Sequence, residues 1–122
     1  MVAKLLEISI FEIVGTPYCV ASGDGQKVFD RLSAILNEAR PVALSFHNVV
    51  IVTSAFLNAA IGQLYGKFDE ATIRALLTVR DMSGDDAQLL RRVVETAKHY
   101  FADPERIEQG IREAMGDGSD ER

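Results

Sequence analysis

Two adjacent hydroxyl residues, Thr53 and Ser54, are the best candidates for chemistry in this chain of 122 residues. They follow the apolar run 49–52 and stand at the start of an amphipathic segment, so they mark a predicted helix start. A hydroxyl at that position accepts a hydrogen bond from an amide of the first turn and caps the helix. The free amides and partial positive charge of a helix N-terminus also suit an anion or a phosphoryl group. Capping and a phosphate-related role are therefore both compatible with these two residues.

The other residues of reactive type do not form a catalytic pattern. Cys19, His47 and His99 are widely spaced, and no glycines flank a nucleophile in the manner of an elbow motif. Two histidines and one cysteine leave no metal-binding constellation, and the glycines at 23–25 lack the spacing of a nucleotide-binding loop. We therefore expect no catalytic residue, no metal and no cofactor. We interpret His47 with Asn48 as a polar turn at the end of a strand.

The charge balance is acidic, with 13 Lys and Arg against 18 Asp and Glu and a formal net charge of −5. This balance argues against nucleic acid or an anionic membrane as a partner, because both need a basic face. Arg91 and Arg92 are interpreted as part of a solvated helix face. A single cysteine cannot form an internal disulfide, and the N-terminus has no secretory pattern, so we expect a cytoplasmic location.

Residues 41–66 contain no Asp, Glu, Lys or Arg, which is a length sufficient to span a bilayer. Polar residues interrupt the stretch, and its pattern changes halfway from alternating to helical. We therefore expect a buried strand and a buried helix, with no membrane span. Phe56 is expected near the rim of the preceding loop, partly open to a partner. The residues of the helix that are predicted to face the sheet are Leu57, Ala60, Ile61 and Leu64.

Alternating and helical periodicities along the chain predict an α/β order of strands and helices. Because helical crossovers favour parallel neighbours, we expect a mainly parallel sheet of about four strands, made mixed by an N-terminal hairpin. A single domain is expected over residues 1–115, followed by a polar tail at 116–122. The predicted strands are 4–14, 18–20, 41–46 with 49–52, and 72–79. The predicted helices are 26–38, which Asp24 caps, 54–67, one that starts at Ser83 and a short one that starts at Pro104.

The segment from Val42 to Leu57 resembles the central signature of STAS domains. The matching residues are the run Val42-Ala43-Leu44-Ser45-Phe46-His47-Asn48-Val49, followed by Val52-Thr53-Ser54-Ala55-Phe56-Leu57. The segment is most similar to the STAS-like branch of unknown function, in which a Thr-Ser-Ser-Phe-Leu type motif replaces Asp-Ser-Ser-Gly-Leu. The resemblance covers about residues 25–101. It implies a mixed sheet with helices and, as in anti-sigma-factor antagonists, a loop serine that a partner kinase phosphorylates.

Transferred residue by residue, this resemblance is incomplete. The phosphoacceptor serine of the family falls on Ala55, which has no hydroxyl, while the neighbouring serine is kept as Ser54. The acidic residue that opens the motif falls on Thr53, and an earlier strand aspartate falls on Ser45. We therefore expect no phosphorylation at position 55, and regulation through the abundance of the partner or through a phosphosite displaced to Ser54 or Thr53. We expect the Ser54 side chain to turn toward the amides of the first helical turn.

The resemblance implies a non-catalytic regulatory module for signalling, which binds a partner protein through the loop and helix start around 47–58. The implied partner is an ATPase or kinase of the histidine-kinase-like fold, or an anti-sigma factor. The alternatives are a small α/β enzyme or an anion- or nucleotide-binding protein that uses the helix N-terminus at Thr53-Ser54. A homodimer is a further alternative. The expected contact residues are His47, Asn48, Thr53, Ser54, Ala55, Phe56 and Asn58.

Overall fold

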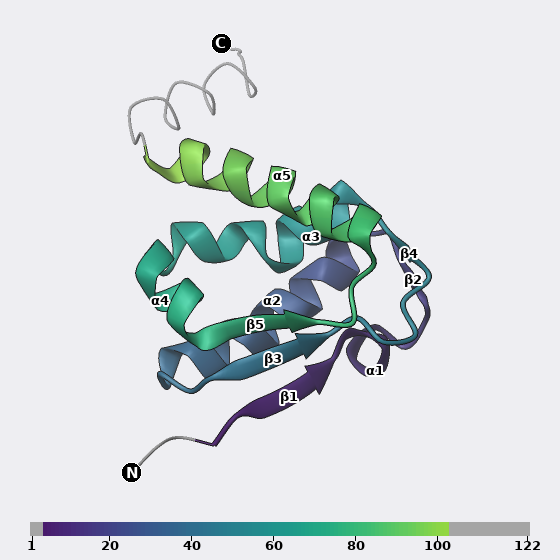
Figure 1. Cartoon of the computed structure of the whole chain (residues 1–122), viewed down its shortest axis with the longest axis horizontal. Coiled ribbons are helices and arrows are strands. Elements are labelled where there is room, and N and C mark those ends of the chain that lie inside the picture. The colour runs from purple at the N-terminus through teal and green to yellow at the C-terminus, as the bar shows by residue number, and fades with distance from the viewer. Residues whose placement is uncertain (1–3, 103–122) are drawn as a thin grey trace.

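The computed structural model describes residues 4–102. Its centre is a parallel sheet of three strands in the order β1 (Leu6–Ser9), β3 (Val42–Ser45) and β5 (Leu77–Arg80). A second, two-stranded parallel sheet pairs β2 (Tyr18–Cys19) with β4 (Ile51–Val52) and lies beyond the carboxyl ends of the three central strands (Figure 1). The predicted α/β class, with a parallel sheet and helices packed against it, is confirmed.

The end of one parallel strand and the start of the next lie at opposite ends of the sheet, so long crossover connections are needed. The helices form these connections. Helix α2 packs against α3 and β3, and α5 packs against α3 and the 3-10 helix η1. In Figure 1, α5 forms the outermost layer on the side away from the sheet. The bounds of the helices are α1 Ile10–Val14, α2 Ser22–Asn37, α3 Ser54–Ala60, η1 Gly62–Gly66, α4 Glu70–Leu76 and α5 Gly84–Ala102.

The two faces of the central sheet differ in chemistry. Successive strand residues point to opposite faces, and the register aligns the apolar positions of all three strands on the face that joins the core. The opposite face is polar. There the side chains of Glu7 and Arg80 meet across the central strand, with 3.6 Å between Oε2 and Nη1, above the buried Ala43. This ion pair links the two outer strands across β3 on the polar face.

The predicted strand 4–14 is wrong beyond Ser9, because the chain turns there into helix α1. The hydroxyl of Ser9 caps this helix by accepting from the amide of Glu12 at 3.2 Å, and Gly15 ends it with a left-handed φ of 85°. The predicted N-terminal hairpin is also wrong, since β2 pairs in parallel with β4. Throughout residues 4–102 the paired strands are parallel, in two sheets and not in one mixed sheet.

The predicted strand 72–79 is correct only at its end. Residues Glu70–Leu76 form α4, and the strand begins at Leu77. The carboxylate of Asp69 accepts from the amide of Thr72 at 2.9 Å and so fixes the helix start. The helix predicted at 26–38 begins earlier, at Ser22, with Ala21 as its N-cap, so Asp24 lies in the first turn and is not the cap.

The uncharged stretch 41–66 folds as a buried strand and a buried helical segment, as predicted. All four residues of β3 are buried, and so are Leu57, Ala60, Ile61 and Leu64. The single predicted helix 54–67 is divided, because α3 ends at Ala60 and the tighter η1 follows. The prediction for Phe56 is wrong, since its side chain is fully buried. Within residues 4–102, the model contains no helix with the length and apolar character that crossing a membrane requires.

Helix α5 starts where the sequence predicts, because the hydroxyl of Ser83 accepts from the amide of Asp86 at 3.2 Å. The short helix predicted from Pro104, the domain limit at 115 and the tail 116–122 lie outside the described residues.

Candidate functional site

A tight turn follows β3 and carries two of the predicted contact residues. The amide of Val49 donates to the carbonyl of Phe46 at 3.0 Å, which places His47 and Asn48 at the exposed tip. Asn48 has a φ of 70°, a left-handed conformation that asparagine tolerates better than most residues. The interpretation of His47 and Asn48 as a polar turn at a strand end is therefore confirmed.

The buried hydroxyl of Ser45 joins this turn to the end of β5. It donates to Oδ2 of Asp81 at 3.0 Å and accepts from the amide of His47 at 3.1 Å. Asp81 also has a positive φ, of 62°. Asn48 and Asp81 thus both have a positive φ, which non-glycine residues rarely adopt. Both lie close to Ser45 at the carboxyl end of the sheet.

Thr53 is the N-cap of α3. Its Oγ1 accepts from the amide of Phe56 at 3.2 Å and donates to the carbonyl of Val20 at 2.7 Å. One hydroxyl therefore starts the helix and fastens it to the end of β2. The expectation that Ser54 turns toward the first-turn amides is wrong, because Thr53 provides the cap and Ser54 is exposed at the first helical position.

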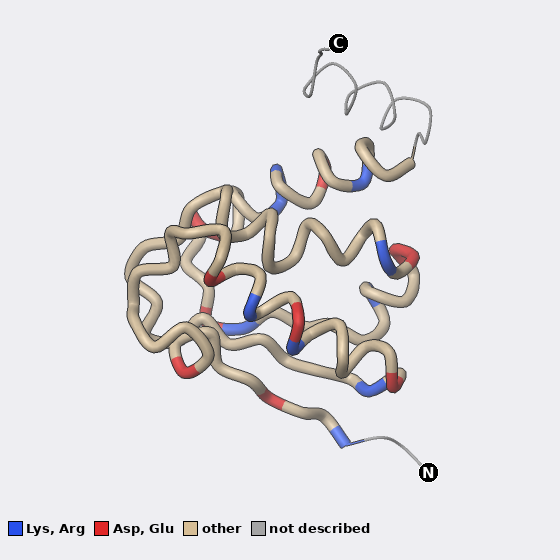
Figure 2. The backbone as a smooth tube through the Cα atoms, turned by 180° about the vertical axis from the view of Figure 1, so that it is seen from behind, with Lys and Arg blue, Asp and Glu red and all other residues tan. Residues whose placement is uncertain are grey.

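Four exposed apolar residues lie in the strands of the small sheet or directly next to them, before Thr53 and around its partner Val20. Tyr18 is 55% exposed, Val20 47%, Val50 67% and Ile51 48%. Tyr18 and Ile51 are register partners in the β2–β4 pair. We call these four residues the apolar patch. The two segments that form it, 13–23 and 41–66, contain no Asp, Glu, Lys or Arg, and Figure 2 shows both free of charged positions.

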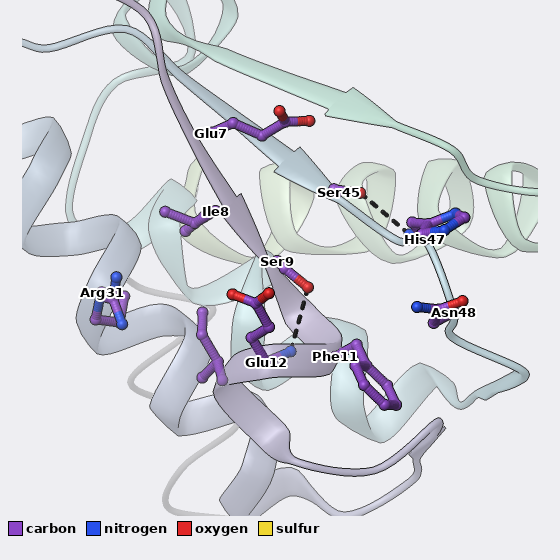
Figure 3. Close-up of a pocket in the computed structure, with 10 residues that line it drawn as sticks. Glu7, Ile8, Ser9, Phe11, Glu12, Arg31, Ser45, His47 and Asn48 are labelled. Atoms are coloured by element: carbon purple, nitrogen blue, oxygen red, sulfur yellow. Dashed lines mark hydrogen bonds between the residues drawn. The ribbon is translucent and has the colours of Figure 1, made fainter.

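A cavity of about 670 Å³ lies at the carboxyl ends of β1 and β3 (Figure 3). In open α/β sheets, ligands commonly bind outside this edge. Figure 3 shows His47 and Asn48 on one side of the cavity and Arg31 of α2 on the other, with Glu12 of α1 between them. The cavity therefore has acidic, basic and polar neutral side chains around it. The lining residues are Glu7, Ile8, Ser9, Phe11, Glu12, Ile13, Arg31, Ser45, His47 and Asn48.

A second cavity, of about 560 Å³, lies between α3 and α5. We call it the α3–α5 cleft. Its lining residues are Ser54, Ala55 and Asn58 from α3, with Leu89, Arg92, Val93 and Thr96 from α5.

The residues predicted as one contact surface are therefore divided. His47 and Asn48 line the first cavity, Ser54, Ala55 and Asn58 line the α3–α5 cleft, Thr53 is engaged in capping, and Phe56 is in the core.

Sequence reasoning missed the contribution of α5 to this region. The spacing in the sequence is sufficient to place four residues of α5 on one helix face, and these are Leu89, Arg92, Val93 and Thr96. The packing of that face next to the start of α3 was not predictable from the spacing, because it depends on tertiary structure. Arg92, interpreted from sequence as part of a solvated face, is exposed and also lines the cleft.

The only cysteine in the chain, Cys19, is buried under the small sheet. Burial, reinforced by the negative charge of Asp24, raises the pKa of its thiol to about 11. The thiol is therefore protonated at neutral pH, which suits a structural role. No group of three His, Cys, Asp or Glu side chains in the part of the chain that the structure describes is arranged to hold a metal ion.

Comparison with known proteins gives a family for this arrangement. Residues 24–87 match the family described as STAS-like domain of unknown function (DUF4325). Neither the curated proteins nor the solved structures include a significant match. The matched segment runs from the first turn of α2 to the first turn of α5, and so contains the turn at His47, the cap at Thr53 and all of α3. The chain therefore belongs to the family of STAS-like domains of unknown function.

Proposed function

We propose that the chain is a non-catalytic regulatory module that binds a partner protein through residues 47–58 and the adjoining apolar patch. The patch is the observation that carries this proposal, because four exposed apolar residues lie in or next to the two paired strands of the small sheet, on segments that contain no charged residue. Contiguous exposed apolar surface marks interaction sites. The centres of protein interfaces are also depleted in charge and enriched in aromatic residues, and Tyr18 provides such a residue here.

A binding role, as opposed to a catalytic one, agrees with the state of the reactive groups. The hydroxyl of Thr53 is engaged in two hydrogen bonds, and that of Ser45 in two more. Cys19 is buried and has a raised pKa. Ser54 is exposed beside the patch, where a partner can reach it.

Membership in the STAS-like family supports a partner of the kind that anti-sigma-factor antagonists bind. The proposed partner is an ATPase or kinase of the histidine-kinase-like fold, or an anti-sigma factor. Ala55 has no hydroxyl to phosphorylate, so control by phosphate in this chain falls on Ser54 or on Thr53. Of the two, Ser54 is the more exposed, which makes it the better acceptor.

The test is capture of the partner from the native host by the tagged chain, with its identity read by mass spectrometry and its affinity then measured with the purified partner. We expect Val50→Asp to weaken binding by at least about tenfold, because a carboxylate would be desolvated in an apolar interface. Val50 is the most exposed residue of the patch, so its replacement leaves the core intact.

Leu5→Asp is the matched control, because Leu5 is an exposed apolar residue outside the patch, and it is expected to bind as the wild type does. Equal affinities for the two variants would show that the patch is not the interface.

A further inference from the structure

The α3–α5 cleft lies next to the proposed interface and includes residues of α5, which is outside the sequence motif at 42–57. Ser54, Ala55 and Asn58 of α3 form one wall. The other wall is one face of α5, about forty positions later in the sequence, with residues at spacings of three and four. Ser54 lines the cleft, and the neighbouring Thr53 is hydrogen-bonded to Val20 of the apolar patch, so the cleft begins close to one end of the patch.

Among the described residues that line the cleft, Arg92 is the only charged one. Lys98, on the same helix, does have salt-bridge partners. Its Nζ lies 3.0 Å from a carboxylate oxygen of Glu70 and 3.3 Å from one of Glu95. No carboxylate of residues 4–102 lies within 4.0 Å of the Arg92 guanidinium, although the chain as a whole is acidic. The cleft therefore has an exposed positive group with no counter-charge in the described chain.

The remaining lining of the cleft is neutral and includes apolar and polar side chains. Leu89 and Val93 supply apolar surface, and Asn58 supplies an amide. Gly62 of η1 leaves the space that this amide occupies, because a Cβ there would lie 2.6 Å from Oδ1 of Asn58 and 3.5 Å from Cγ1 of Val93. The Asn58 amide therefore lies over Gly62 and next to Val93, and it adds a polar group to the wall of the cleft.

We propose that the α3–α5 cleft receives a segment of the partner protein that presents an Asp or Glu to Arg92 and an aliphatic side chain to Leu89 and Val93. This inference rests on the proposed function, and it names the chemistry of the partner. A guanidinium binds a carboxylate through two parallel hydrogen bonds, which fixes geometry as well as charge. Charge complementarity at Arg92 therefore favours an acidic segment over a neutral or basic one in this cleft.

The test uses a random peptide library displayed on phage, selected against the whole chain. The wild type is expected to enrich peptides in which Asp or Glu lies next to Leu, Ile or Val. Synthetic versions of these peptides are then measured by fluorescence anisotropy against variants of the cleft. Arg92→Glu and Ala55→Trp are expected to weaken binding by at least about tenfold, the first through charge reversal and the second by filling the cleft.

Arg91→Glu is the matched control, because it makes the same change of charge at the adjacent exposed residue, which does not line the cleft. It is expected to bind the peptides as the wild type does. Absence of acidic enrichment, or equal binding by Arg92→Glu and Arg91→Glu, would overturn the inference.

The purified partner separates this inference from the proposed function. Loss of partner binding in Val50→Asp but not in Arg92→Glu refutes the inference and leaves the proposed function in place. Retention of partner binding in Val50→Asp refutes the proposed function, whatever the peptides do.

Discussion

The hydroxyl of Thr53 joins two parts of the chain that are far apart in sequence. It accepts from Phe56 within its own helix and donates to Val20 at the end of β2. Because the carbonyl of Val20 and the amide of Phe56 both depend on this one oxygen, the side chain determines how α3 is placed against the small sheet. The exposed residues that follow, Ser54 and Ala55, are presented by a fixed helix start.

Thr53→Val is expected to lower the free energy of unfolding by about 1–3 kcal/mol, because it keeps the shape of the side chain and removes both hydrogen bonds. Chemical denaturation measures the loss. Thr53→Ser, which keeps the hydroxyl, and Ser54→Ala, which removes an exposed one, are expected to stay within about 0.5 kcal/mol of the wild type. A loss in Ser54→Ala as large as in Thr53→Val would show that Ser54 is the true cap.

Individual residues were predictable from the sequence where a local rule determines them. The polar turn at His47 and the cap of α5 at Ser83 both follow from short-range hydrogen bonding. A hydroxyl cap at the start of α3 was also predicted, but the sequence did not decide between Thr53 and Ser54. Phe56 and Arg92 were not predictable in this way. Whether Phe56 is open or buried depends on how closely another helix approaches, and the place of Arg92 depends on which neighbour its helix face meets.

Helices α2 and α3 approach each other closely at Gly25. A Cβ at this position would lie 2.5 Å from the carbonyl oxygen of Phe56 and 2.9 Å from Cβ of Ala59. The glycine thus allows the α2 backbone to rest on the first turns of α3, where the ring of Phe56 enters the core. Contact between these helices explains why Phe56, which follows an exposed loop, is not exposed itself.

Gly25→Ala is expected to destabilise the protein by about 1–3 kcal/mol, because the added methyl group meets backbone atoms that cannot move aside. Gly23→Ala is its control within the same helix. A Cβ at Gly23 meets nothing within 4 Å, so alanine there is expected to stabilise the helix by about 0.5–1 kcal/mol. Thermal unfolding distinguishes the two, and a rise in midpoint for both variants would contradict the close approach of α2 and α3.

Among the elements, the errors occurred where two periodicities fit the same residues. In 4–14 the apolar residues suit a strand as far as Ser9, but Ile10, Ile13 and Val14 also share a helix face, and the Ser9 cap decides for the helix. In 72–79 the β-branched residues favour a strand, whereas the Asp69 cap and the contacts of α4 with η1 hold most of the segment helical. The strand at 42–45 was predicted correctly because its residues fit no amphipathic helix.

The stability of the whole molecule is expected to decrease in alkaline solution because of Cys19. Burial raises the pKa of the folded thiol from 9.0 to about 11, whereas the unfolded thiol titrates near its ordinary value. Above pH 9 the unfolded chain releases a proton that the folded chain retains, so the free energy of unfolding falls between about pH 9 and pH 11. Urea denaturation at several pH values measures this slope.

Cys19→Ala is the control for this pH dependence, since it removes the thiol and keeps a small apolar side chain under the sheet. The variant is expected to be less stable at pH 7 and to lose less stability than the wild type on going from pH 9 to pH 10. Identical pH profiles in the two proteins would exclude the thiol as the cause.

The parallel order of the central sheet also affects how the chain can fold. Each pairing of β3 with its neighbours joins residues 35 or 36 positions apart, so the sheet contains no hairpin that could form by itself. Contacts between distant residues carry a large loop-closure entropy and slow the search for the native state. During synthesis, β1 and β3 can pair early, but the sheet is complete only when Arg80 has left the ribosome. The helices α3 and η1 of the uncharged stretch 41–66 gain their cover later still, because α5, which packs on both, follows β5 in the chain. A nascent chain that has not reached α5 therefore exposes apolar surface, the property that makes folding intermediates prone to aggregate.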